Sequence, residues 1–204
     1  MPGAVAAIVA ARRTRGYARP PPRTSGIDGE RWAEMQKEVE KRKKLTILFK
    51  KYDTNGSKKL ERDQIINLLT DLDAETPSGT KPTDDEVDFI LKVADQSGDD
   101  CLSRKELEHA TQAWHVYTKK RALMEDKIKE FDKSGTGKLE KPELKEYLVS
   151  LNGGQPVTDE EVEWVFSEAD LFGDGAIRQT ELVMATAAWY VHVEKKKSAC
   201  CTVL

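Results

Sequence analysis

The sequence predicts an all-α fold of two lobes, each a pair of helix-loop-helix units, and three observations support this prediction. First, the segment from Glu30 to about residue 194 repeats itself at an offset of 75 residues. Second, four loops rich in oxygen donors interrupt this segment, and the stretches between them have helical apolar spacing. Third, no strand-rich segment competes with the helices. We therefore expect a helical body with a disordered basic N-terminal tail and a flexible C-terminal tail.

Capping signals mark equivalent helix starts in the two halves of the repeat. Thr83 and Glu86 recur 75 residues later as Thr158 and Glu161. In such a capping box, the hydroxyl and the carboxylate satisfy backbone amides that have no other partner at the start of a helix. One helix in each half is therefore expected to begin directly after these threonines.

Two tryptophans and a long segment without Gly or Pro extend the helical prediction. Trp114 and Trp189 lie at equivalent points of the two halves, and at helical spacing we expect both in a core. Residues 103–131 contain neither Gly nor Pro, so one unbroken helix between the lobes and a helix bent at residues 119–121 both fit. The segment from Glu30 to Lys44 is expected to be a solvated helical extension, with an autoinhibitory helix as the alternative.

Composition divides the chain into four segments. The first carries five Arg, one Asp and three consecutive Pro without a sustained apolar period, which is typical of a disordered segment. The next two segments are the lobes, and the last is a basic tail with a lipid-modification signal. The predicted boundaries are residues 1–29, 30–120, 121–194 and 195–204.

The balance of charge favours cations as partners of the folded body. The chain has a net charge of -3, but without residues 1–29 it holds 28 basic and 35 acidic residues and a net charge of -7. This sign opposes binding of nucleic acid. The three cysteines provide neither a disulfide framework nor paired zinc ligands, so we expect a reducing compartment. No catalytic motif occurs, and we expect no enzyme activity.

Four twelve-residue loops share one pattern of oxygen donors. They begin at Asp53, Asp95, Asp132 and Asp170. Calcium takes six to eight oxygen ligands, and such a loop supplies them from positions 1, 3 and 5, from the backbone carbonyl at position 7, and from both oxygens of a Glu at position 12. Position 6 needs a positive φ angle, and position 8 is apolar because it pairs with the partner loop. The residues at position 8 are Leu60, Leu102, Leu139 and Ile177.

These loops resemble those of the EF-hand family, and four loops in two pairs look like a calmodulin-type protein across residues 30–194. The resemblance implies Ca²⁺ as the bound ion. It also implies an unidentified protein target, with an amphipathic helix as the expected binding element.

The second and third loops are predicted to be the tighter calcium sites, because only they combine ligands at positions 1, 3 and 5 with Glu at position 12. The predicted ligands of the second loop are Asp95, Ser97, Asp99, the carbonyl of Cys101 and Glu106. Those of the third loop are Asp132, Ser134, Thr136, the carbonyl of Lys138 and Glu143. Asp100 stands where the second loop should have Gly, and we expect a modest penalty because Asp tolerates a positive φ.

The first and fourth loops are predicted to be weak or empty sites. The candidate ligands of the first loop are Asp53, Asn55, Ser57, the carbonyl of Lys59 and Gln64. Gln64 offers one uncharged oxygen where a carboxylate is wanted. The candidate ligands of the fourth loop are Asp170, Asp174, the carbonyl of Ala176 and Glu181. Here Phe172 removes the oxygen expected at position 3, and Arg178 adds a repelling charge beside the ion.

The last four residues resemble a geranylgeranylation signal on Cys201, and the neighbouring Cys200 is a candidate for palmitoylation. With Lys195–Lys197, such a tail predicts attachment to a membrane surface, on the inner face of the plasma membrane or another membrane. A frayed, unmodified terminus is the plain alternative. The Arg-rich start of the chain leaves a second location open, because it also fits a mitochondrial transit peptide.

Three functions fit the sequence. The favoured one is a membrane-anchored cytoplasmic calcium sensor, whose lobe opens when the ion binds and exposes apolar surface to a partner. A calcium buffer, which binds without opening, is the first alternative. A light-chain-like structural subunit, which grips a target helix with or without calcium, is the second.

Overall fold

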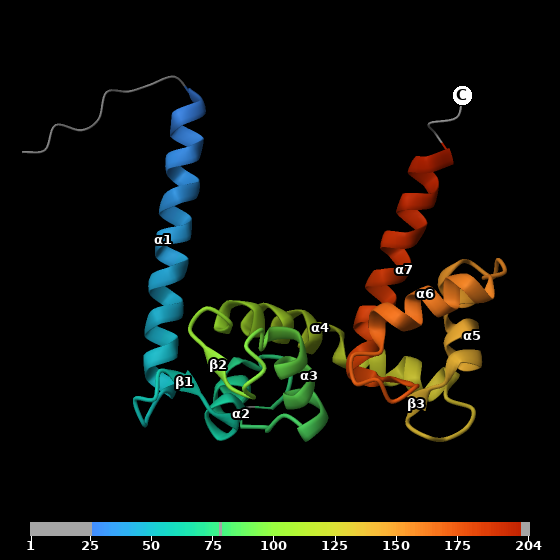
Figure 1. Cartoon of the computed structure of the whole chain (residues 1–204), viewed down its shortest axis with the longest axis horizontal. Helices are drawn as coiled ribbons and strands as arrows, with labels where there is room; N and C mark the ends of the chain where they lie inside the picture. Colours follow the sequence, from blue (N-terminus) through green and yellow to red (C-terminus); the bar gives the residue numbers. More distant parts are fainter. Residues whose placement is uncertain (1–25, 78, 201–204) are drawn as a thin grey trace, which may run out of the picture. The chain divides into compact units, whose positions relative to one another are not determined.

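The computed structural model describes residues 26–77 and 79–200 (Figure 1). These residues form seven helices and four strands of two residues each, which confirms the predicted all-α fold. The chain separates after Arg42 into two units. Cys201 and residues 1–25 lie outside the described residues, so lipid attachment and the disordered N-terminal tail stay predictions.

Helix α1 (Gly26–Tyr52) begins inside the segment that the sequence assigned to the N-terminal tail and continues past Arg42 into the second unit. In its first part, Trp32, Met35 and Val39 are 56%, 51% and 47% exposed. This agrees with a solvated helical extension.

The second unit contains both lobes. The first lobe consists of the end of α1, β1 (Lys59–Leu60), α2 (Arg62–Leu72), α3 (Asp84–Ala94), β2 (Leu102–Ser103) and the start of α4 (Leu107–Phe131). The second lobe consists of the end of α4, β3 (Lys138–Leu139), α5 (Lys141–Leu151), α6 (Asp159–Ala169), β4 (Ile177–Arg178) and α7 (Gln179–Cys200).

Short antiparallel strands join the two loops of each lobe. Leu60 pairs with Leu102, and Leu139 pairs with Ile177. All four side chains are fully buried. The prediction that the apolar residue at position 8 pairs with the partner loop is therefore confirmed.

The predicted capping boxes are present at the starts of α3 and α6. Thr83 Oγ1 accepts a hydrogen bond from the Glu86 amide at 3.3 Å, and the Thr83 amide donates to Glu86 Oε2 at 2.8 Å. Thr158 and Glu161 make the same two bonds at 3.3 and 3.0 Å. Two equivalent helices thus begin at the predicted threonines.

Each lobe has its own apolar core, and Trp114 and Trp189 are buried in these cores as predicted. Trp114 belongs to the first core and Trp189 to the second, with 1% and 2% of their surface exposed. The indole Nε1–H of Trp114 donates to the Leu69 carbonyl at 2.9 Å, which satisfies the polar atom of this buried ring.

Helix α4 is one continuous helix of 25 residues, and residues 119–121 do not interrupt it. It spans about 38 Å at 1.5 Å per residue and serves both lobes. Helix α7 continues through Lys195 to Cys200, which the sequence assigned to the flexible tail. Among the described helices, none combines the length and the apolar character needed to cross a membrane.

Candidate metal centre

The third loop brings four of its predicted ligand groups into one hydrogen-bonded chain. Ser134 Oγ donates to Asp132 Oδ1 at 3.1 Å and lies 3.3 Å from Thr136 Oγ1. Thr136 Oγ1 donates in turn to the carbonyl of Lys138 at 3.2 Å. These neutral and charged oxygens thus lie close together, as the ligands of a hard cation must.

The second loop has a similar arrangement with one addition. Ser97 Oγ donates to Asp95 Oδ1 at 3.0 Å, and the Cys101 amide donates to Asp99 Oδ1 at 3.2 Å. The other oxygen of Asp99 forms an ion pair with the ammonium group of Lys59, which belongs to the first loop. A cation of the protein itself therefore contacts the position 5 ligand of this loop.

The glutamates at position 12 of the second and third loops are turned into their own loops. Glu143 Oε1 accepts hydrogen bonds from the amides of Lys133 and Ser134 at 2.9 and 2.8 Å. Glu106 Oε1 accepts equivalent hydrogen bonds from the amides of Gln96 and Ser97, both at 3.0 Å. Burial raises the pKa of each carboxyl group, but hydrogen bonds from loop residues outweigh burial and hold each pKa below its usual value. Both groups are therefore ionised at neutral pH, as calcium ligands must be.

The first loop differs at position 12 in the way that its sequence predicts. Gln64 Oε1 accepts from the Glu61 amide at 3.1 Å, and Gln64 Nε2 donates to Thr54 Oγ1 at 3.2 Å. The side chain thus turns a donor toward the start of the loop, where the other loops have a carboxylate oxygen. Asp53 Oδ1 is buried and has no hydrogen-bond partner among the described residues. The side chains of Asn55 and Ser57 make hydrogen bonds within the loop. Asn55 Oδ1 accepts from the Ser57 amide at 3.1 Å, and Ser57 Oγ donates to the carbonyl of Lys59 at 2.8 Å.

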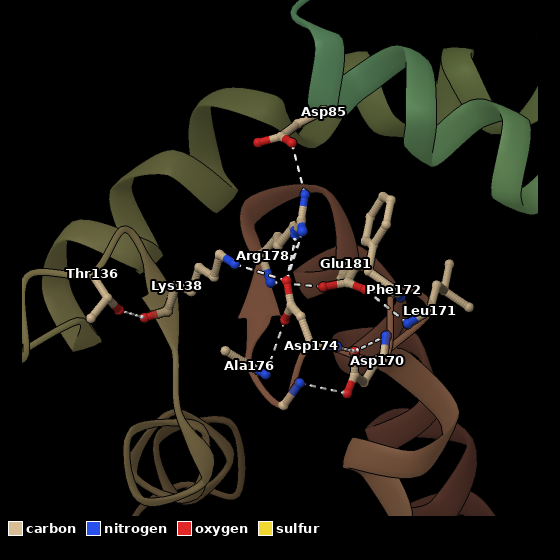
Figure 2. A network of polar contacts seen from close by, with 12 residues as sticks. Asp85, Thr136, Lys138, Asp170, Leu171, Phe172, Asp174, Ala176, Arg178 and Glu181 are labelled. Carbon is tan, nitrogen blue, oxygen red and sulfur yellow. Dashed lines mark hydrogen bonds and ion pairs between the residues drawn. The ribbon is translucent and has the colours of Figure 1, made fainter.

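The fourth loop keeps the frame of a metal loop without its full set of oxygens (Figure 2). Asp170 Oδ1 accepts hydrogen bonds from the amides of Gly173 and Asp174 at 2.7 and 3.2 Å. The Ala176 amide donates to Asp174 Oδ1 at 3.2 Å. Phe172 supplies no ligand atom at position 3.

Glu181, at position 12 of the fourth loop, is fully buried. Burial raises the pKa of Glu181, and the nearby negative charge of Asp170 adds to this effect. The carboxyl groups of Glu106 and Glu143 show the opposite shift. The fourth loop therefore favours the ionised form of its position 12 carboxyl group less than the second and third loops do.

Two residues that replace Gly at position 6 adopt the conformation that the loop requires. Asp100 has a φ of 57° and Lys58 a φ of 66°, while Gly137 and Gly175 at the same position have φ values of 78° and 80°. The expectation that Asp100 takes a positive φ is therefore confirmed. Lys58 shows that the backbone of the first loop is also intact.

The donor set of these loops suits calcium rather than a transition metal. The predicted ligand oxygens of the second and third loops come from carboxylates, hydroxyls and backbone carbonyls, the mixture that a hard cation accepts. The individual ligand assignments stay predictions.

The 75-residue repeat also relates two polar clusters that the sequence analysis did not identify. In the first lobe, Glu86 Oε1 accepts from Tyr117 Oη at 2.9 Å and forms an ion pair with Arg121 Nε at 2.8 Å. In the second lobe, Glu161 contacts the residues at the same offsets, His192 and Lys196. Extending the repeat comparison into the last helix of each lobe would have aligned Tyr117 with His192 and Arg121 with Lys196.

The cluster around Glu161 predicts a loss of stability at acidic pH. Burial raises the pKa of Glu161, but hydrogen bonds from Lys196, the Thr158 amide and His192 outweigh burial and lower it to about 2. Because the unfolded value is near 4.3, the ionised form stabilises the folded state fully above about pH 5. This contribution is lost as the pH falls toward 2. Urea unfolding at several pH values should show a weaker decline for Glu161→Gln than for the unchanged protein.

Glu168→Gln is the matched control, because it removes the same charge from an exposed position of α6. It should keep the pH dependence of the unchanged protein. If the free energy of unfolding falls equally between pH 5 and pH 2 in Glu161→Gln and in the unchanged protein, Glu161 is not the source of this pH dependence.

Paired helix-loop-helix units, joined by short antiparallel strands and with oxygen donors gathered in their loops, define the class of helix-loop-helix calcium-binding proteins. The chain belongs to the EF-hand family, because the family profile described as an EF-hand domain pair matches residues 42–112 and 123–186. It is a Ca²⁺-binding protein of the calmodulin-like type.

The chain is similar to several proteins, some of which carry calcium binding in their names. Polcalcin Cup a 4 of Hesperocyparis arizonica is 29% identical over 137 residues, which cover 67% of this chain and 76% of that protein. The probable calcium-binding protein CML14 of Oryza sativa subsp. japonica is 32% identical over 125 residues, which cover 59% of this chain and 66% of that protein. Among solved structures, a redox protein from Chlamydomonas reinhardtii matches with a TM-score of 0.39 and 19% identity, over 76% of this chain and 53% of that chain.

Proposed function

We propose that this protein is a calcium sensor whose second and third loops hold the two tighter ions, and that it regulates a protein partner. The observation that carries this proposal is the position of Glu106 and Glu143. Glu106 is the N-cap of α4, and Glu143 lies in the first turn of α5. Each carboxylate reaches back to the start of its loop. Ion binding that draws the carboxylate toward the metal would therefore move a helix.

Movement of these helices would expose apolar surface. Leu107 and Ala110 of α4 and Leu144 and Leu148 of α5 are fully buried in the two cores. Calcium-driven opening of paired EF-hands uncovers such residues as a groove for an amphipathic helix. A buffer would keep them covered.

The two proposed sites are not equal. Lys59 already pairs with Asp99 in the second loop, whereas Asp132 of the third loop has only neutral hydrogen-bond partners among the described residues. Calcium must displace the ammonium group of Lys59 before Asp99 can act as a full ligand. We therefore propose that the third loop fills before the second.

Calorimetric titration with calcium, combined with a fluorescent dye that binds apolar surface, tests the proposal. The expected result is two bound ions and an increase in dye fluorescence with Ca²⁺. Two ions without a dye response would identify a buffer. If an amphipathic target helix binds equally well with and without calcium, the protein is a light-chain-like subunit. No bound ion would contradict the assignment of both loops.

Attachment of this sensor to a membrane surface is a further part of the proposal. It rests on Cys201 with Cys200 and on the lysines before them. Cytoplasmic location is proposed on the same basis, and the mitochondrial alternative stays open.

A further inference from the structure

The fourth loop contains its own cations. Arg178 Nε and Nη2 lie 2.9 and 2.7 Å from Asp174 Oδ2, and Lys138 Nζ lies 2.8 Å from the same oxygen (Figure 2). Two positive side chains thus neutralise the position 5 carboxylate of this loop without a metal ion.

Arg178 also reaches the first lobe. Its remaining terminal nitrogen, Nη1, lies 2.8 Å from Asp85 Oδ1, in the first turn of α3. Figure 2 shows the guanidinium group between the two carboxylates of Asp85 and Asp174. The Arg178 side chain is 23% exposed and the Asp85 side chain 63%, so only the Arg178 end of the ion pair is shielded from solvent. One guanidinium fork therefore links carboxylates that are far apart in the sequence.

Phe172 takes part in the same contact. The guanidinium carbon of Arg178 lies 4.2 Å from the centre of the Phe172 ring, which is a close cation–π arrangement. Phe172 and its neighbour Leu171 pack against the apolar core of the first lobe. The residue that removes a calcium ligand is thus also one that joins the lobes.

The internal repeat shows that both substitutions are specific to the fourth loop. The residues 75 positions earlier are Ser97 in place of Phe172 and Ser103 in place of Arg178. Ser97 supplies a ligand oxygen in the second loop, where no arginine contacts Asp99 among the interactions of the described residues. The two positions that weaken the fourth loop as a calcium site are therefore the same two that make its contact with the first lobe.

We propose that the fourth loop is a metal-independent clasp between the lobes, in which Arg178 takes the place of the ion at Asp174 and binds Asp85, while Phe172 packs on the first core. The clasp works whether or not the second and third loops bind calcium. It limits how far the lobes separate, and a partner that binds between them must first break the contact between Arg178 and Asp85.

Nuclear magnetic resonance of the full chain without calcium tests the clasp. Arg178→Gln should shift the amide signals of residues 84–86 in α3, although these residues lie more than 90 positions away in the sequence. Asp85→Asn is the reciprocal variant and should shift the amide signals of residues 174–178. The Asp85 side chain is 63% exposed, so this second variant should fold.

Arg104→Gln is the matched control, because it removes the same charge from an exposed position of the second loop. It should leave both groups of signals unchanged. Shifts that stay within the lobe of each substitution would overturn the proposal.

Discussion

Replacing Glu106 and Glu143 together by Gln is expected to abolish the two tighter calcium sites, with a loss of affinity of at least about 100-fold at each. Each substitution removes one of two ligand oxygens and the negative charge. The first loop shows what a Gln does at this position: the Gln64 amide donates to Thr54 instead of turning an acceptor into the loop. Calorimetric titration of the double variant should therefore detect no ion in the affinity range of the unchanged protein.

The single variants separate the two loops. Glu143→Gln should remove the ion that we propose binds first, because among the described residues no ammonium group contacts the predicted ligands of the third loop. Glu106→Gln should leave that ion in place. The control Glu168→Gln removes the same charge from an exposed position and should bind like the unchanged protein. If the double variant still binds two ions with little loss of affinity, the assignment of the sites to these loops is wrong.

Replacing Arg121 by Met is expected to lower the free energy of unfolding of the first lobe by about 3 kcal/mol. Arg121 forms ion pairs with Asp73 at 2.7 Å and Glu86 at 2.8 Å, and these carboxylates are only 3% and 8% exposed. Its guanidinium group also lies over the rings of Trp114 and Tyr117. Removing the cation leaves two buried carboxylates without the positive charge that compensates them, although each keeps other hydrogen-bond donors. The value stays at the low end for a buried pair because Arg121 itself is 17% exposed.

Urea unfolding in the absence of calcium, followed by circular dichroism, measures this effect. Lys196→Met is the matched control, since Lys196 occupies the equivalent position in the second lobe and pairs with Glu161. The Lys196 side chain is 62% exposed, so its loss should cost less than about 1 kcal/mol. Equal effects of the two substitutions would show that burial does not distinguish the two clusters.

The sequence alone determined the features that depend on neighbours along the chain. The four loops, the capping boxes at Thr83 and Thr158 and the pairing of apolar residues at position 8 were all predicted and are present. The burial of Trp114 and Trp189 followed from helical spacing. These features are recognisable because a loop of twelve residues or a helix start is stabilised by hydrogen bonds within a few residues, so that a fixed spacing encodes each of them.

Only the tertiary structure decided which charged side chains meet across elements. Lys59 meets Asp99 in the partner loop, and Arg178 meets Asp85 in the other lobe. Sequence spacing identified Arg178 as a repelling charge at a metal site, whereas the folded chain gives it two carboxylate partners. Long side chains have many rotamers, and the packing of helices far apart in sequence selects the one that finds a partner. The loops are thus local in origin, while the partners of their charged side chains are decided by how the loops and lobes pack.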